Sequence, residues 1–396
     1  MSADHAPGNY SYLVVFAMVL VLLCAFVMGF NALIDPLARL LLVDRPGLNQ
    51  VKVELEPNSR KGKATALRQC GYDTIILGTS RAETAIATSQ PGFAGAEVYN
   101  AALRAGTMFE MRRMAEYAAS QHKLKAVLLS LDFEAFNSRT MVAEDFSESP
   151  LASKQSASSL ARYLFSLQTF GQSVATLQAN VQGNPVMCAD NGEHKRTYEL
   201  IAARKAFNFI LRRYASGHYG RYVTDDRHMQ HLAAMLNELI RAGVKVYAFT
   251  SPMHVTHLEL MASVGLMDEY DNWRRELATV FAEANQGLPE ARRAVLWDFS
   301  GYNLITTEQV PDPDVQPFMR WYEDSSHFNK DVGSIMVNRM LGIEGGEPQL
   351  NSEFGTVLTP ENVEARIEAD RRGSERYRRE NRAEIENLRR MLESSG

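Results

Sequence analysis

Residues 73–81 read Asp-Thr-Ile-Ile-Leu-Gly-Thr-Ser-Arg, an apolar run that ends abruptly in Gly-Thr-Ser-Arg. A short continuous apolar run of this kind is typical of a strand that is buried on both faces of a parallel sheet. In such sheets ligands bind beyond the carboxyl ends of the strands. Ser80 directly follows the run, so it is a candidate nucleophile at a sheet edge.

Apolar runs and helical patterns alternate on both sides of this segment. We expect strands at Asp73–Leu77, Glu97–Tyr99, Ala126–Leu131, Lys245–Thr250 and Arg293–Phe299. We expect helices at Met108–Ser120, Leu160–Asn180, Tyr198–Tyr214, Arg227–Ala242, Met267–Ala284 and Lys330–Leu341. This alternation predicts a three-layer α/β domain of flavodoxin-like type over residues 70–345, with a parallel sheet covered by helices. Residues 138–226 break the rhythm and are interpreted as a helical insertion or lid.

The residues from Leu13 to Ile34 form an apolar stretch without a charged side chain. Its length is enough for a helix to cross a hydrocarbon core of about 30 Å. A cleaved signal peptide would have a shorter apolar stretch, basic residues before it and a small-x-small site after it. We therefore interpret residues 13–34 as a transmembrane anchor rather than a buried core helix. Residues 1–12 are then a short tail and residues 35–69 a connecting segment.

The orientation of this anchor is left open by the charges beside it. No Lys or Arg precedes the span, whereas Arg39, Arg45 and Lys52 follow it. The positive-inside rule would place the large domain in the cytoplasm, but long domains cross membranes largely regardless of such charges.

The composition sets broad limits on function. The 396 residues are 45% apolar and carry a net charge of −5, which allows a large core and gives no indication of nucleic-acid binding. Cys24 lies in the apolar stretch. A bridge between Cys70 and Cys188 would fit an oxidising compartment, but we expect two separate buried thiols.

A second chemical signal lies late in the chain, where residues 322–329 read Tyr-Glu-Asp-Ser-Ser-His-Phe-Asn. Asp324 and His327 are three residues apart, which puts both side chains on one side of a turn. Asp324 could then hold the imidazole tautomer while the other ring nitrogen faces Ser80. The structural alternative is that Ser80 or Thr79 merely caps the following helix. The two segments together predict a Ser-His-Asp site.

These motifs resemble those of the SGNH or GDSL-type hydrolase superfamily. The Gly-Thr-Ser-Arg segment at residues 78–81 matches the Gly-x-Ser variant of its first block, and Asp324 with His327 matches its last block. The resemblance covers residues 70–342. It is strongest to membrane-anchored cell-envelope members, such as relatives of the D-alanyl-transfer protein of teichoic-acid modification and of alginate O-acetylation proteins.

The resemblance implies a serine esterase or acyltransferase that acts on acyl esters, above all O-acetyl esters, of a cell-envelope glycan. It implies a periplasmic or extracytoplasmic domain that works with other membrane proteins of an acyl-transfer system. No cofactor or metal is expected. The alternative is a non-catalytic envelope protein that keeps a degenerate site and binds a glycan or an assembly partner.

The oxyanion donors of this family come from a glycine after the second strand and an asparagine after the third. Here Gly106 is the corresponding glycine, and Asn100 is a candidate side-chain donor. After the third strand the chain has Asp132, which cannot donate to an oxyanion when it is ionised. Either Asn100 or Asn137 takes that role, or the site is not that of a standard hydrolase.

Other polar residues are secondary candidates. Arg81 could bind a substrate carboxylate or phosphate, with the Gly-Thr-Ser-Arg turn acting as an anion site, or it could lie on a helix surface. His254 follows the fourth strand and could line the pocket or be structural. His228 and His231 could bind a metal, but no third ligand is evident.

Residues 346–396 form a tail that is rich in Arg and Glu. Thr359 and Pro360 are suited to the start of a helix, as the N-cap and the first helical residue. Because acidic and basic residues nearly balance, we expect a solvated helix with i,i+4 charge pairs.

Overall fold

The computed structural model describes residues 8–184, 188, 191–193, 202–312, 318–343 and 354–393. The chain divides into two compact units, Met1–Cys70 with Glu144–Ala189 and Gly71–Ala143 with Asp190–Gly396. Residues 35–69 are therefore part of a folded unit, where we expected only a connecting segment. The expected insertion at residues 138–226 is divided between the two units.

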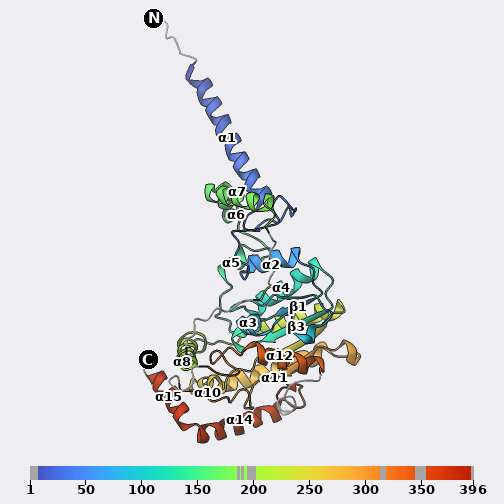
Figure 1. Ribbon diagram of the computed structural model, residues 1–396, viewed down its shortest axis with the longest axis vertical. Coiled ribbons are helices and arrows are strands. Elements are labelled where there is room, and N and C mark those ends of the chain that lie inside the picture. The colour runs from blue at the N-terminus through green and yellow to red at the C-terminus, as the bar shows by residue number, and fades with distance from the viewer. Residues whose placement is uncertain are drawn as a thin grey trace. The chain divides into compact units, whose positions relative to one another are not determined.

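The first unit is helical. Its helices are α1 (Gly8–Ile34), α2 (Arg60–Gln69), α5 (Glu144–Ser147), α6 (Ala157–Phe165) and α7 (Leu167–Val181) (Figure 1). The single helix expected over Leu160–Asn180 is thus two helices that are separated at Ser166. Within the described residues, Ser11–Ile34 of α1 is long enough and apolar enough to cross a membrane, and its most apolar part is not covered by protein.

The C-terminal end of α1 is built into this unit. Asn31 is fully buried, and its side-chain amide donates to the backbone carbonyls of Leu164 and Ser166 at 2.9 and 3.2 Å. The ammonium group of Lys52 donates to the carbonyls of Ile34 and Asp35. The Lys52 contacts satisfy carbonyls at the end of α1 that would otherwise lack partners, and the Asn31 contacts tie α1 to the junction of α6 and α7.

Cys70 and Cys188 form a disulfide bond within the first unit. Our expectation of two separate thiols was therefore wrong. The sequence separation of 118 residues hid the pairing, because only the packing of α2 and α7 segments in one unit brings these cysteines together. Cys24 is a free cysteine.

The second unit contains a six-stranded sheet with the order β2-β1-β3-β4-β5-β6. The strands are β1 (Thr74–Leu77), β2 (Val98–Asn100), β3 (Ala126–Leu131), β4 (Lys245–Thr250), β5 (Val295–Asp298) and β6 (Thr356–Val357). The first five are parallel and confirm the expected strands. The short β6 pairs antiparallel with β5 and was not expected. The mixed α/β class is confirmed.

Helices cover both faces of this sheet. They are α3 (Ser80–Ala85), α4 (Met108–Gln121), α8 (Ala203–Arg213), α9 (Asp226–Arg241), α10 (Val255–Ser263), α11 (Met267–Ala284), α12 (Lys330–Leu341), α14 (Val363–Glu380) and α15 (Arg382–Glu393). Shorter turns are η1 (Pro91–Phe93), η2 (Phe133–Phe136), η3 (Tyr214–Tyr219) and η4 (Glu290–Arg292). Helices α3 and α12 contact each other, and α9 packs between α4 and α11.

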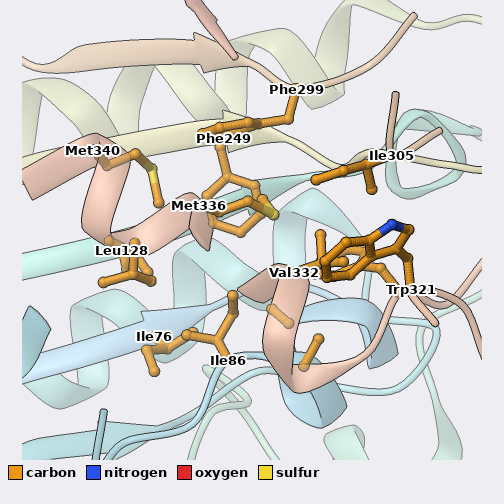
Figure 2. Packing of buried hydrophobic residues seen from close by; sticks show 14 of the residues in the cluster. Ile76, Ile86, Leu128, Phe249, Phe299, Ile305, Trp321, Val332, Met336 and Met340 are labelled. Carbon is orange, nitrogen blue, oxygen red and sulfur yellow. The ribbon is translucent and has the colours of Figure 1, made fainter. Parts of the chain in front are cut away.

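The main hydrophobic cluster lies between the sheet and α12 (Figure 2). Ile76, Leu128 and Phe249 come from β1, β3 and β4, and Val332 and Met336 come from α12. Residues before and after these strand positions point to the opposite face because side chains alternate along a strand. The cluster fixes the start of α12 beside the ends of the strands, just after His327.

The C-terminal helices are packed on the second unit and are not the solvated tail that we expected. Val363 and Ile367 of α14 are buried, and Asp370 makes an ion pair with the buried Arg274 of α11. Helix α14 begins at Val363, so the expected start at Thr359 and Pro360 was wrong.

Candidate active site

The turn after β1 aims Ser80 away from the sheet. Gly78 has a φ of +153°, and an added Cβ would lie 2.6 Å from the Cβ of Ser130 on the neighbouring strand. Only glycine fits this position without strain. Thr79 is the N-cap of α3, as the structural alternative proposed, but Ser80 is the first helical residue and its hydroxyl is left for another partner.

The hydroxyl of Ser80 contacts the histidine of the Asp324–His327 motif. Ser80 Oγ lies 2.8 Å from His327 Nε2, and the two residues are 247 positions apart. His327 Nδ1 lies 2.8 Å from Asp324 Oδ2 and 2.9 Å from Asp324 Oδ1. Asp324 Oδ1 also accepts the backbone N–H groups of Ser326 and His327. The structure therefore places these three side chains in one continuous chain of contacts.

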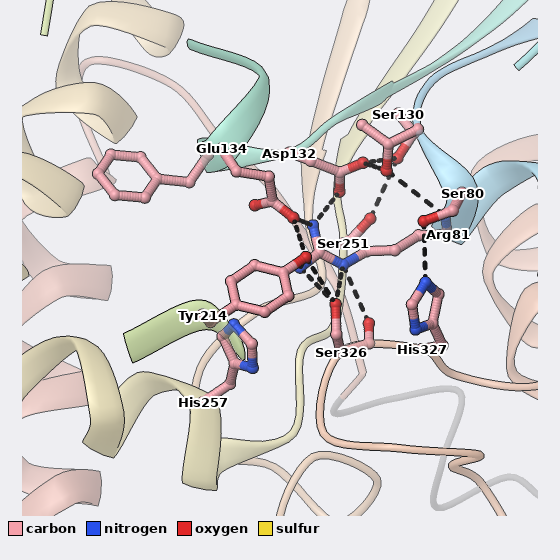
Figure 3. Close-up of polar contacts among 12 residues, drawn as sticks. Ser80, Arg81, Ser130, Asp132, Glu134, Tyr214, Ser251, His257, Ser326 and His327 are labelled. Carbon is pink, nitrogen blue, oxygen red and sulfur yellow. Dashed lines mark hydrogen bonds and ion pairs between the residues drawn. The ribbon is translucent and has the colours of Figure 1, made fainter. Parts of the chain in front are cut away.

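Arg81 is 1% exposed. Figure 3 shows its side chain among Asp132, Glu134 and Ser326. Its guanidinium forms ion pairs with Asp132, at 3.2 Å, and with Glu134. Its Nε donates to the carbonyl of Ser326 at 2.9 Å, and Nη2 donates to the Ser326 hydroxyl at 2.7 Å. The expectation that Arg81 binds a substrate anion was wrong because all these partners lie inside the protein. The guanidinium instead supports the loop between Asp324 and His327.

Two carboxylates and a tyrosine complete this buried network. Asp132 accepts the Thr79 hydroxyl, so it also fixes the turn that carries Ser80. Tyr214 of η3 donates to Glu134 at 2.9 Å. Although burial opposes its charge, the nearby Glu134 and Asp132 raise the pKa of Arg81 above its ordinary value. Burial and the charge of Glu134 raise the pKa of Tyr214.

The expected oxyanion donors are used elsewhere. The N–H of Gly106 donates to the carbonyl of Leu103 at 2.9 Å. The side-chain amide of Asn100 is fully buried and donates to carbonyls at the end of α3, including Ala82 at 3.0 Å. The amide of Asn137 donates to the carbonyl of His218 at 3.2 Å. Gly106 still lines the pocket, but the roles expected for Gly106, Asn100 and Asn137 are not supported.

The histidine candidates are structural. His254 is fully buried, caps α10 and contacts the carbonyl of Glu308 through Nε2 at 2.6 Å. Burial lowers its pKa to about 4, so it is neutral near pH 7. His254 does not line the pocket, and that alternative was wrong. Among the described residues, His228 and His231 belong to no group of three or more ligands that could hold a metal ion.

A pocket of about 550 Å³ opens beside Ser80 and His327. One wall is formed by the turn of residues 104–106, and another by one face of α8 and the start of η3. Phe209, Ile210 and Tyr214 give this second wall an apolar and aromatic surface, and Lys205 and Arg213 stand at exposed positions of the same helix. The pocket could hold a substrate group larger than an acetyl ester alone.

Sequence reasoning missed the supporting residues of this site. Asp132 and Glu134 follow β3 at the same sheet edge as Ser80, and that placement was a usable signal. Tyr214 and Ser326 gave no comparable signal, because their roles depend on packing between distant segments.

The chain matches no protein-family model and no curated protein. Among solved structures, it is similar to a chain described as a "putative platelet activating factor" from Streptococcus pneumonia. The two are 8% identical, with a TM-score of 0.33, and the match covers 72% of this chain and 91% of that chain. This TM-score is too low to carry an argument about fold or activity.

Proposed function

We propose that the protein is a membrane-anchored, SGNH-like serine esterase or acyltransferase. The observation that carries the proposal is the Ser80 to His327 contact of 2.8 Å at the pocket, with Asp324 on the other ring nitrogen. A nucleophile, a base and a group that orients the base define this type of site by geometry. The strand order β2-β1-β3-β4-β5 is that of flavodoxin-like sheets and supports the SGNH-like assignment.

The proposed reaction begins when Ser80 Oγ attacks the ester carbonyl carbon and His327 Nε2 takes the hydroxyl proton. The tetrahedral intermediate collapses to an acyl-Ser80 ester, and the leaving alcohol takes the proton from His327. Water or a sugar hydroxyl then attacks the acyl group, and His327 again accepts and returns a proton. Asp324 keeps Nδ1 protonated and stabilises the imidazolium that forms in each half of the reaction.

The oxyanion would be held by fewer donors than in typical members of the superfamily. The N–H of Ser80 is at the first position of α3, where helical N–H groups lack an intrahelical acceptor. The second donor would come from Ala105, whose turn lines the pocket. Loss of one donor costs about 3 kcal/mol of transition-state stabilisation, which predicts slow turnover rather than none.

Helix α1 is the proposed membrane anchor. Its last turns are bonded into the first unit through Asn31, so cleavage of α1 as a signal sequence would remove part of that unit's core. The Cys70–Cys188 disulfide supports an oxidising, extracytoplasmic location for the folded units.

The proposed substrate is an acyl ester, above all an O-acetyl ester, of an envelope glycan. This part of the proposal comes from the resemblance described above. The pocket supports it in one respect, since Phe209 and Tyr214 offer aromatic surface on which a sugar ring can pack beside Ser80.

A fluorophosphonate probe tests the proposal on the full-length, detergent-solubilised protein. We expect covalent labelling of wild type and its loss in Ser80→Ala. The matched control is Ser216→Ala, which removes an exposed serine hydroxyl that donates to the backbone carbonyl of Arg212 in the preceding helix α8. Folded wild type that takes up no probe, or labelling that survives Ser80→Ala, would refute the serine nucleophile.

The second candidate function is a non-catalytic protein that binds an envelope glycan or an assembly partner. The observation that favours it is that Gly106, Asn100 and Asn137 all use their donors in internal contacts. Glycan binding without probe labelling, and with equal affinity in Ser80→Ala, would support this alternative.

A further inference from the structure

Helix α7 has one stripe of polar side chains that faces inward. Thr169, Ser173, Thr176 and Asn180 recur at helical spacing and are all buried. Ser173 donates to Asn31 of α1 at 3.0 Å, and Asn180 exchanges hydrogen bonds with the backbone of Val51. The polar stripe of α7 is therefore the stripe that holds the helix in the first unit.

The apolar side chains of α7 form a second stripe, about a third of a turn around the helix from the buried polar stripe. Leu167, Phe170, Val174, Leu177 and Val181 follow one another at intervals of three or four residues, and all five are at least partly exposed. Leu167 is 76% exposed and Val181 is 72% exposed. A surface helix of a water-soluble protein has the reverse arrangement, with its apolar stripe toward the core.

The absence of charged side chains from α7 also favours contact with an apolar environment. Its sequence, residues 167–181, contains no Asp, Glu, Lys or Arg. A helix that lies in a membrane interface usually has a charged face toward water. Here the exposed polar side of α7 is uncharged and includes Gln168 and Gln178. Phe165, at the end of α6, adds a further side chain that is 51% exposed beside this surface.

The depth of α7 follows from its contacts with α1. The rings of Phe26 and Phe30 lie 6.2 and 5.2 Å from the ring of Phe170. An apolar span of about 20 residues that begins at Leu13 reaches the far boundary of the hydrocarbon core near Asn31. Phe26 then lies roughly 7 Å inside that boundary, at 1.5 Å per residue. Phe170 is therefore at the level where hydrocarbon meets headgroups.

We infer that α7 lies in the interface of the bilayer that α1 crosses, with its apolar stripe in the lipid. Figure 1 shows α6 and α7 running across the C-terminal end of α1, the arrangement that this inference requires. The lipid surface is favoured over a protein partner because the stripe is continuous with α1 through Phe170. The inference rests on the proposed anchor role of α1. It adds a second membrane contact that would fix the tilt of α1.

Spin-label accessibility tests this inference on the full-length chain in phospholipid nanodiscs. Single cysteines are introduced by Leu167→Cys and Val181→Cys in a Cys24→Ala background that retains the native disulfide. Both positions are highly exposed, so a label should not disturb packing. Val21→Cys, on the exposed surface of α1, is the control for lipid. Glu54→Cys replaces an exposed carboxylate of the same unit and is the control for water.

Labels at Leu167 and Val181 should be open to oxygen and lose most of their accessibility to a water-soluble nickel chelate, as at Val21. Nickel accessibility equal to that at Glu54, with Val21 in lipid, would overturn the interfacial position of α7 alone. If Val21 is also open to nickel, the anchor proposal fails as well. Low accessibility to both reagents at Leu167 and Val181 would indicate protein contact, such as a second copy, and would also overturn the inference.

Discussion

Replacement of Arg81 by methionine tests the central claim about how the site is built. The guanidinium is 1% exposed and compensates two carboxylates, Asp132 and Glu134. Removing one partner of a buried ion pair typically costs about 3–5 kcal/mol because the remaining charge is left uncompensated. At about 2–4 °C per kcal/mol for a domain of this size, the unfolding midpoint should fall by roughly 6–20 °C.

Arg81→Met should also slow probe labelling at temperatures well below its midpoint. The substitution removes the donors to the carbonyl and hydroxyl of Ser326, which lies between Asp324 and His327. A misplacement of about 1 Å in a reacting group can cost about 100-fold in rate. We therefore expect a decrease of roughly that size in the rate constant for labelling of Ser80.

Two further variants separate the structural and positioning roles of Arg81. Arg81→Lys keeps the charge but not the planar fork, so it should recover more of the stability than of the labelling rate. Arg212→Met removes an exposed arginine of α8 and should change stability by no more than about 0.5 kcal/mol. Folded Arg81→Met with the wild-type labelling rate would refute the positioning role. An unchanged midpoint would refute the argument from buried charge.

Three other changes have clear expected outcomes. Asp324→Asn should reduce the labelling rate about 10³–10⁴-fold with the fold retained on thermal melting, because an amide no longer enforces the His327 tautomer. His254 has its pKa lowered by burial from 6.5 to about 4. The unfolded chain therefore takes up this proton first, and stability should fall by up to about 3 kcal/mol as the pH drops from 6.5 to 4. His254→Gln should flatten that part of the profile in chemical denaturation, and an unchanged slope would contradict the assignment. Replacing both Cys70 and Cys188 by serine should cost about 4–5 kcal/mol of stability in the first unit, since the bridge closes a loop of more than 100 residues. As the matching control, chemical reduction of the disulfide in wild type should cause an equal loss of stability. Treatment of the double-serine variant with the same reductant should cause no loss.

The parallel sheet could be predicted from the sequence because its strands are buried on both faces. Ala126–Leu131 and Lys245–Thr250 have the expected bounds, since the apolar run and the strand coincide there. The approach of Ser80 to His327 also followed from a general rule, that carboxyl ends of parallel strands share one edge. Continuous local patterns were enough for these features.

The remaining features depend on contacts between distant segments. Nothing near Arg81 in the sequence indicates that it is buried, because its partners Tyr214 of η3 and Ser326 come from distant segments. The first unit was missed because it combines two segments that are far apart in the sequence, Met1–Cys70 and Glu144–Ala189. Strand β6 is two residues long and carries no periodic signal.

Asp132 and Arg81 form a buried ion pair, so each residue depends on the charge of the other. The turn after Gly78 directs the residue after Ser80 inward, so an arginine there needs buried carboxylates as partners. Asp132 supplies one of them, and its other oxygen accepts the Thr79 hydroxyl that fixes the Ser80 turn. An asparagine at this position would leave Arg81 with one partner fewer, and its amide would still face the Thr79 hydroxyl rather than the pocket. The aspartate at position 132 therefore has a structural cause in the same site, because it holds both Arg81 and the turn that carries Ser80.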